Sequence, residues 1–192
     1  MAKHENLIKY LNKHQYKGII FDFDGTLYKL LIDWSMLKKD LFYVIRELTS
    51  QTPDDTPLIK VLFKYRKEIP QLYEKLKKIY QDYEILGFKE GKVNRKLLSF
   101  INQRSRKKFA IYSMSTGKVI AKFLKKYNLQ EAFSYIISQD NAYAAKPFRS
   151  DLEKIIKFWN FNNKEILIVG NSNYDIQSGE MTNIRALLIE SF

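Results

Sequence analysis

Short apolar runs alternate with helical segments over most of this chain, and this alternation limits its fold more than any other feature. Each apolar run is rich in β-branched or aromatic residues, which predicts a buried strand. These runs are Gly18–Asp24, Phe109–Ser113, Tyr135–Ser138, Ile166–Val169 and Ile184–Ile189. Apolar residues recur at helical spacing in the intervening segments, which include Val93–Asn102, Gly117–Tyr127 and Ser150–Trp159. This order predicts an α/β fold with a parallel sheet, because parallel strands need crossover connections.

A stretch of about sixty residues interrupts the alternation directly after the first strand. Between Asp33 and Gly87, apolar residues keep a helical period and show no strand-like alternation, which predicts three or four helices. Insertions are tolerated where both ends leave the same edge of a sheet. We therefore expect residues 1–30 and 89–192 to form a Rossmann-like α/β core domain. Residues 31–88 are expected to form an all-helical domain inserted after the first strand.

Two carboxylates stand two residues apart at the end of the first strand, in the sequence Asp22-Phe23-Asp24-Gly25-Thr26-Leu27. Close carboxylates repel each other unless a cation lies between them, and carboxylate oxygens with a backbone carbonyl suit Mg²⁺. Asp24-Gly25 alone is also a common turn, but Asp22 lies within an apolar strand pattern, where an uncompensated charge is costly. Ligands of parallel α/β sheets bind outside the carboxyl ends of the strands. We interpret this cluster as functional.

This cluster resembles the first motif of the haloacid dehalogenase (HAD) superfamily of phosphatases, which reads Asp-x-Asp-Gly-Thr-Leu. In that superfamily the first Asp attacks phosphorus, and the second is the general acid and base. The resemblance implies that Asp22 is the nucleophile, that Asp24 is the acid/base, and that both contribute to a Mg²⁺ site. It also implies that Thr26 contacts the substrate phosphate.

Two further motifs of the superfamily have counterparts along the chain. Ser113 closes an apolar strand and is expected to donate to a phosphoryl oxygen, with Ser115 as a lesser candidate. A serine there could also be an ordinary turn residue. Lys146, in Ala145-Lys146-Pro147, matches the Lys-Pro pair of many members and is expected to offset the charge of Asp22 and of the phosphate. Any one lysine of a lysine-rich chain could instead be solvated surface.

The fourth motif departs from the superfamily pattern. The sequence Val169-Gly170-Asn171-Ser172-Asn173-Tyr174-Asp175 resembles Gly-Asp-Ser-x-x-Asp, with Asn171 at the usual position of the first Asp. An amide oxygen can coordinate Mg²⁺ but lacks the charge of a carboxylate, so the metal affinity is expected to fall. The expected metal ligands are Asp22, Asp24, Asn171 and Asp175, the last either directly or through water.

The composition adds a basic surplus and excludes sulfur chemistry. The chain has 33 Lys and Arg against 21 Asp and Glu, a net charge of +12, and the lysines are spread along its whole length. This surplus suits a phosphorylated ligand or nucleic acid, but a solvated basic surface explains it equally well. The chain has no cysteine, which excludes disulfides, thiolate zinc sites and cysteine nucleophiles. No signal sequence or membrane span is evident, so we expect a cytoplasmic protein.

The leading hypothesis is Mg²⁺-dependent hydrolysis of a small-molecule phosphomonoester through an aspartyl-phosphate on Asp22. In the superfamily, a helical insertion at this point is a mobile cap that selects small substrates, and a phosphomutase uses the same chemistry. The alternative is a binding or regulatory protein of the same fold with little turnover, motivated by Asn171 and by the +12 charge. A third, weaker hypothesis is a factor that associates with nucleic acid through its basic surface. The expected partner is a small phosphorylated metabolite and not a membrane, and the oligomeric state stays open.

Overall fold

The computed structural model describes residues 4–53, 56–104 and 107–190. The chain divides into two compact units. The first comprises residues 1–29 and 92–192, and the second comprises Leu30–Gly91.

A parallel sheet forms the centre of the first unit. Its described strands are β1 (Gly18–Phe21), β4 (Lys108–Tyr112), β5 (Phe133–Ile137), β6 (Ile166–Gly170) and β7 (Arg185–Leu188), in the order β5-β4-β1-β6-β7. Every neighbouring pair runs parallel. The predicted Rossmann-like α/β fold is therefore confirmed.

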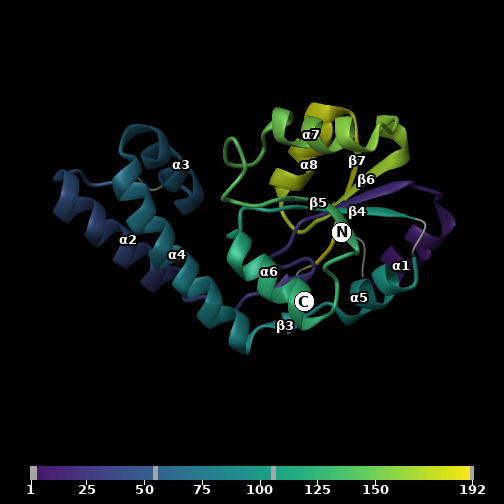
Figure 1. Ribbon diagram of the computed structural model, residues 1–192, viewed down its shortest axis with the longest axis horizontal. Coiled ribbons are helices and arrows are strands. Elements are labelled where there is room, and N and C mark those ends of the chain that lie inside the picture. The colour runs from purple at the N-terminus through teal and green to yellow at the C-terminus, as the bar shows by residue number, and fades with distance from the viewer. Residues whose placement is uncertain (1–3, 54–55, 105–106, 191–192) are drawn as a thin grey trace. The chain divides into compact units, whose positions relative to one another are not determined.

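Helices cover both faces of this sheet. They are α1 (His4–Lys13), α5 (Arg95–Asn102), α6 (Gly117–Lys126), α7 (Arg149–Trp159) and α8 (Asn173–Thr182), and the short 3₁₀ helix η1 (Asn163–Glu165) precedes β6. Figure 1 shows α7 and α8 on one face and α1, α5 and α6 on the other. Because β1 lies in the middle of the sheet, all four of its residues are buried.

Two local predictions for this unit were wrong. Val93 is not helical: β3 (Lys92–Val93) pairs antiparallel with β2 (Tyr28–Lys29), and α5 starts only after Asn94, whose side chain accepts the N–H of Leu97 at 3.2 Å. The helix predicted over Ser150–Trp159 begins one residue earlier, because α7 already starts at Arg149, with Phe148 before it. Both differences move a helix boundary by one or two residues and leave the order of the elements unchanged.

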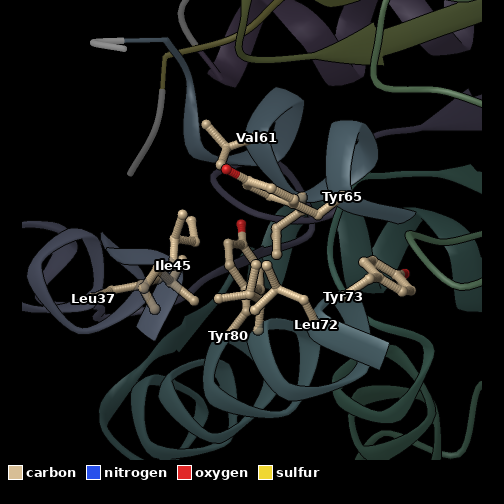
Figure 2. Close-up of a cluster of buried hydrophobic side chains, with 10 residues drawn as sticks. Leu37, Ile45, Val61, Tyr65, Leu72, Tyr73 and Tyr80 are labelled. Atoms are coloured by element: carbon tan, nitrogen blue, oxygen red, sulfur yellow. The ribbon is translucent and has the colours of Figure 1, made fainter. Parts of the chain in front are cut away.

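The described part of the second unit is helical. It contains α2 (Trp34–Thr49), α3 (Leu58–Glu68) and α4 (Pro70–Glu90). Asp33 caps α2 by accepting the N–H of Met36 at 2.9 Å, and Pro70 opens α4 at a position where a missing N–H costs little. Side chains from all three helices pack into one buried cluster, which includes Leu37, Ile45, Val61, Tyr65, Leu72 and Tyr80 (Figure 2).

None of the helices in residues 4–53, 56–104 and 107–190 is both long enough and apolar enough to cross a membrane.

Candidate active site

The polar residues singled out by the sequence follow the carboxyl ends of four strands of the first unit. Asp22 follows β1, Ser113 follows β4, Asn171 follows β6, and Lys146 lies in the connection after β5. Parallel strands end at the same edge of a sheet, so the topology gathers these residues there. The backbone N–H of Asp22 donates to the carbonyl of Val169 at 2.9 Å, which holds the first of them against β6.

The loop after Asp22 is folded tightly by its own backbone. The N–H groups of residues 26, 27 and 28 all donate to the carbonyl of Phe23, at 3.2, 3.0 and 3.0 Å, and Gly25 takes a φ of 76°. Such a φ strains residues with a Cβ, which explains the glycine. Asn94, which lies far along the chain from this loop, stabilises it, because its side-chain amide donates to the carbonyl of Thr26 at 3.1 Å. Sequence reasoning missed Asn94, and its only local signal was that of a helix cap.

A buried lysine joins two of the acids. Lys146 Nζ lies 2.9 Å from Oδ1 of Asp22 and 2.8 Å from Oδ1 of Asp175, although the lysine and Asp22 are 124 positions apart. Burial raises the pKa of the Asp22 carboxyl, and the Lys146 ammonium opposes that rise. Burial also acts to lower the pKa of Lys146, but the carboxylates of Asp175 and Asp22 outweigh it and raise that pKa above its usual range. Lys146 therefore remains a cation beside Asp22.

Tyr112 is a further contact of this lysine that sequence reasoning missed. Lys146 Nζ lies 4.6 Å from the centre of the Tyr112 ring, within the range of a cation–π interaction. The Tyr112 hydroxyl donates to the carbonyl of Phe148 at 3.4 Å, and burial raises its pKa to about 12, so it stays protonated at neutral pH. Within an apolar strand, this tyrosine looks like any core residue and gives no sequence signal.

Asp175 is fully engaged by hydrogen bonds. Oδ1 accepts from Lys146, while Oδ2 accepts from the N–H of Ser172 at 3.1 Å and from its hydroxyl at 2.7 Å. The bonds from Ser172 cap the N-terminus of α8 and hold the Asp175 carboxylate facing Lys146. A Cβ at Gly170 would lie 2.2 Å from the Asp175 carboxyl carbon, so only glycine fits beside it.

We expect Gly170→Ala to lower the free energy of unfolding by about 1–3 kcal/mol, because the added methyl must displace the Asp175 carboxylate from Lys146. Urea unfolding followed by circular dichroism measures this loss. Gly91→Ala is the control, because Gly91 has an ordinary φ of −73°. Equal stability of the two variants would contradict the close approach of Gly170 and Asp175.

The Asn171 amide faces Asp22 and the backbone of Asp24. One of its terminal atoms lies 3.2 Å from Asp22 Oδ2, 3.1 Å from the Asp24 carbonyl oxygen and 3.3 Å from Thr26 Oγ1. With Nδ2 turned inward, the amide donates hydrogen bonds to these oxygens. Thr26 Oγ1 also lies 3.4 Å from Asp22 Oδ2, as a further donor. The Asp22 carboxylate can thus accept hydrogen bonds from Lys146, Thr26 and Asn171 together.

The same geometry fits Mg²⁺ when Oδ1 of Asn171 is turned inward. The Asn171 oxygen then lies 3.2 Å from the Asp22 carboxylate oxygen Oδ2 and 3.1 Å from the Asp24 carbonyl oxygen. Neighbouring ligands of an octahedral Mg²⁺ are about 2.9 Å apart, since each lies about 2.0–2.1 Å from the ion. Within the described residues, no three acidic, histidine or cysteine side chains converge to hold a metal. A metal site at this edge would therefore need the Asp24 carbonyl and the Asn171 amide as ligands.

Ser113 lies at the same edge but outside these contacts. It is buried, its N–H donates to the carbonyl of Ile137 at 2.9 Å, and its Oγ accepts the N–H of Ser115 at 3.2 Å. The structure thus brings Asp22, Thr26, Lys146, Asn171 and Asp175 together, whereas Ser113 is bonded to Ile137 of β5 and to Ser115.

The family model described as haloacid dehalogenase-like hydrolase matches residues 19–189 of this chain. A haloacid dehalogenase-like hydrolase from Streptococcus pneumoniae is similar in structure, with 20% sequence identity and a TM-score of 0.58, over 91% of this chain and 84% of that one. A predicted phosphoglycolate phosphatase from Haemophilus somnus has 15% identity and a TM-score of 0.58, over 91% and 85% of the two chains. A HAD-type protein from Bacillus subtilis, solved with bound magnesium, has 15% identity and a TM-score of 0.58, over 91% and 89%. Among curated proteins, no sequence match is found.

Proposed function

The chain belongs to the haloacid dehalogenase-like hydrolase family, and we propose that it is a phosphatase acting on a small-molecule phosphomonoester. The observation that carries this proposal is the buried ammonium of Lys146, 2.9 Å from the Asp22 carboxylate. A cation at this position attracts the phosphoryl group and offsets the charge of the carboxylate that attacks it. The name of the Haemophilus somnus structure fits this substrate class.

The proposed reaction has two displacement steps. An oxygen of Asp22 attacks phosphorus, the bond from phosphorus to the ester oxygen breaks, and the Asp24 carboxyl donates its proton to the leaving oxygen. This step releases the alcohol and leaves an aspartyl-phosphate. The Asp24 carboxylate then takes a proton from a water that attacks phosphorus, and the bond to Asp22 breaks to release phosphate. Lys146 keeps Asp22 oriented in both steps.

We propose that Asp22 Oδ2, the Asp24 carbonyl and the Asn171 amide oxygen hold Mg²⁺. When bound, the ion supplies positive charge that reduces the repulsion between the carboxylate and the phosphate. Asp175 is proposed to position Lys146 and not to bind the metal, because both of its oxygens already accept hydrogen bonds. Residues 31–88, which lie within the second unit, are proposed as the cap domain that selects substrates.

The proposal is tested with purified protein and a panel of phosphorylated sugars, nucleotides and acids, with Mg²⁺ and with EDTA. Released inorganic phosphate is the readout. Hydrolysis that requires Mg²⁺ supports the assignment. No release from any substrate, para-nitrophenyl phosphate included, would leave the alternative of a binding protein with little turnover.

We expect Asn171→Asp to bind Mg²⁺ at least about tenfold more tightly, because the ligand set gains a negative charge. In EDTA the same variant should be less stable than the wild type, since the hydrogen bonds donated by the Asn171 amide are lost and a second carboxylate repels Asp22. Calorimetric titration with Mg²⁺ and thermal unfolding in both buffers measure these opposite effects without any substrate.

Gln177→Glu adds the same charge further along α8, at an exposed position, and serves as the control. It should leave both the Mg²⁺ affinity and the stability in EDTA close to those of the wild type. An Asn171→Asp variant that behaves like this control would show that Asn171 is not a metal ligand.

A further inference from the structure

A groove of about 670 Å³ lies between α1 and α5 in the first unit. Among the described residues that line it, four are positively charged and none is acidic: Lys9, Arg95, Lys96 and Arg104 carry the charge. Asn12 and Gln103 add neutral donor groups to its walls. A concave surface whose charged side chains are all positive concentrates anionic ligands.

Arg104 is held in place within this groove. Its guanidinium donates to Asn12 Oδ1 at 2.5 Å and lies 5.7 Å from the centre of the Phe100 ring. The remaining donors of a guanidinium in a fixed orientation can bind phosphate with little further loss of side-chain entropy. The Phe100 ring itself is buried, with 4% of its surface exposed, so it offers no platform on which a base could stack.

The charges are spread along the groove. Arg95 opens α5 and Arg104 lies just beyond its end, so the two arginines are nine positions apart. At 1.5 Å per helical residue this is roughly 13 Å, about the rise of four nucleotides along the axis of a stacked strand. Lys9, Arg95 and Lys96 are exposed, which suits a ligand that lies along the surface better than a small molecule enclosed by the protein.

We propose that this groove binds a nucleic-acid strand through its phosphates, without reading the bases. The groove is separate from the catalytic edge, because α1 and α5 lead into the amino ends of β1 and β4, whereas Asp22 and Ser113 follow their carboxyl ends. Binding in the groove therefore needs no part of the hydrolytic site. It gives part of the +12 charge a specific role.

The test is fluorescence anisotropy with a labelled single-stranded RNA of twelve nucleotides. A DNA strand of the same sequence is measured as well, to show whether the groove prefers RNA or DNA. The double variant Lys9→Glu/Arg95→Glu is expected to bind at least about tenfold more weakly than the wild type. The control Lys75→Glu/Lys78→Glu makes the same charge change at exposed positions of α4 and should bind within about twofold of the wild type. Both variants should keep the wild-type circular dichroism spectrum and hydrolytic activity.

Raising the salt concentration from 50 to 200 mM is expected to weaken wild-type binding by roughly 20- to 50-fold, the effect of releasing three or four phosphate counterions from a single strand. Equal losses in the two double variants would overturn the proposal, because net charge alone would then explain binding. Absence of binding at 50 mM salt would overturn it too. So would full competition by polyglutamate at matched charge, which would assign the groove to an acidic protein segment.

Discussion

Asp22→Asn is expected to lower the rate of phosphate release by a factor of at least about a thousand. The neutral amide cannot attack phosphorus, and it also removes the carboxylate oxygen that lies 2.9 Å from Lys146. The measurement is kcat for the best substrate of the panel, with the fold checked by circular dichroism. Little else should change in the overall fold, because the replacement has the same size.

Asp82→Asn is the matched control, since Asp82 is exposed on α4. It should leave kcat within about twofold of the wild type, as surface substitutions away from a site usually do. Phosphate release that survives in Asp22→Asn at near the wild-type rate would show that Asp22 is not the nucleophile, even if the protein is a phosphatase.

Lys146→Met is expected to reduce the free energy of unfolding by about 3–5 kcal/mol, because it leaves the buried carboxylates of Asp22 and Asp175 without their shared cation. Methionine has nearly the same length, so loss of packing contributes little. Hydrolysis should also fall below detection, since Asp22 loses its orienting partner. Urea unfolding in EDTA measures the stability, and Lys157→Met, at an exposed position of α7, is the control.

The stability deficit of Lys146→Met should also depend on pH. Without the ammonium, burial and the charge of Asp175 raise the pKa of the Asp22 carboxyl above that in the unfolded chain. The folded variant then binds more protons than the unfolded chain, so its stability falls as pH rises. The deficit is therefore expected to be larger at pH 8 than at pH 5. A deficit below about 1 kcal/mol at both pH values would contradict the central role of this ion pair.

The sequence alone predicted the parallel sheet, the helical insertion and the edge at which the polar residues gather. These features follow from local patterns: strand runs such as Ile166–Val169 and helical spacing can be recognised within a few residues. Even there, Val93 was assigned to a helix, because its pairing with Tyr28 is formed across more than sixty residues. A strand of two residues has no period of its own.

The candidate site was predicted as a set of residues but not as a set of contacts. Lys146 and Asp22 both carried a signal, whereas Tyr112 and Asn94 looked like a core residue and a helix cap. No pattern in the sequence reported that the oxygens of Asp175 accept hydrogen bonds from Lys146 and Ser172. Which partner a carboxylate takes depends on what surrounds it in space, and no spacing along the chain reports that.

The sequence by itself determined the types of chemical group that this protein brings to the sheet edge, because carboxylate, hydroxyl and amide follow strands that its patterns define and the lysine lies in the connection after another. Only the tertiary structure decided how those groups are paired. Asp22 and Lys146 are 124 positions apart, and Asp22 and Asn171 meet only because β1 and β6 are neighbours in the sheet. Hydrogen bonds and ion pairs act over about 3 Å, so they depend on the folded distance between atoms and not on separation along the chain.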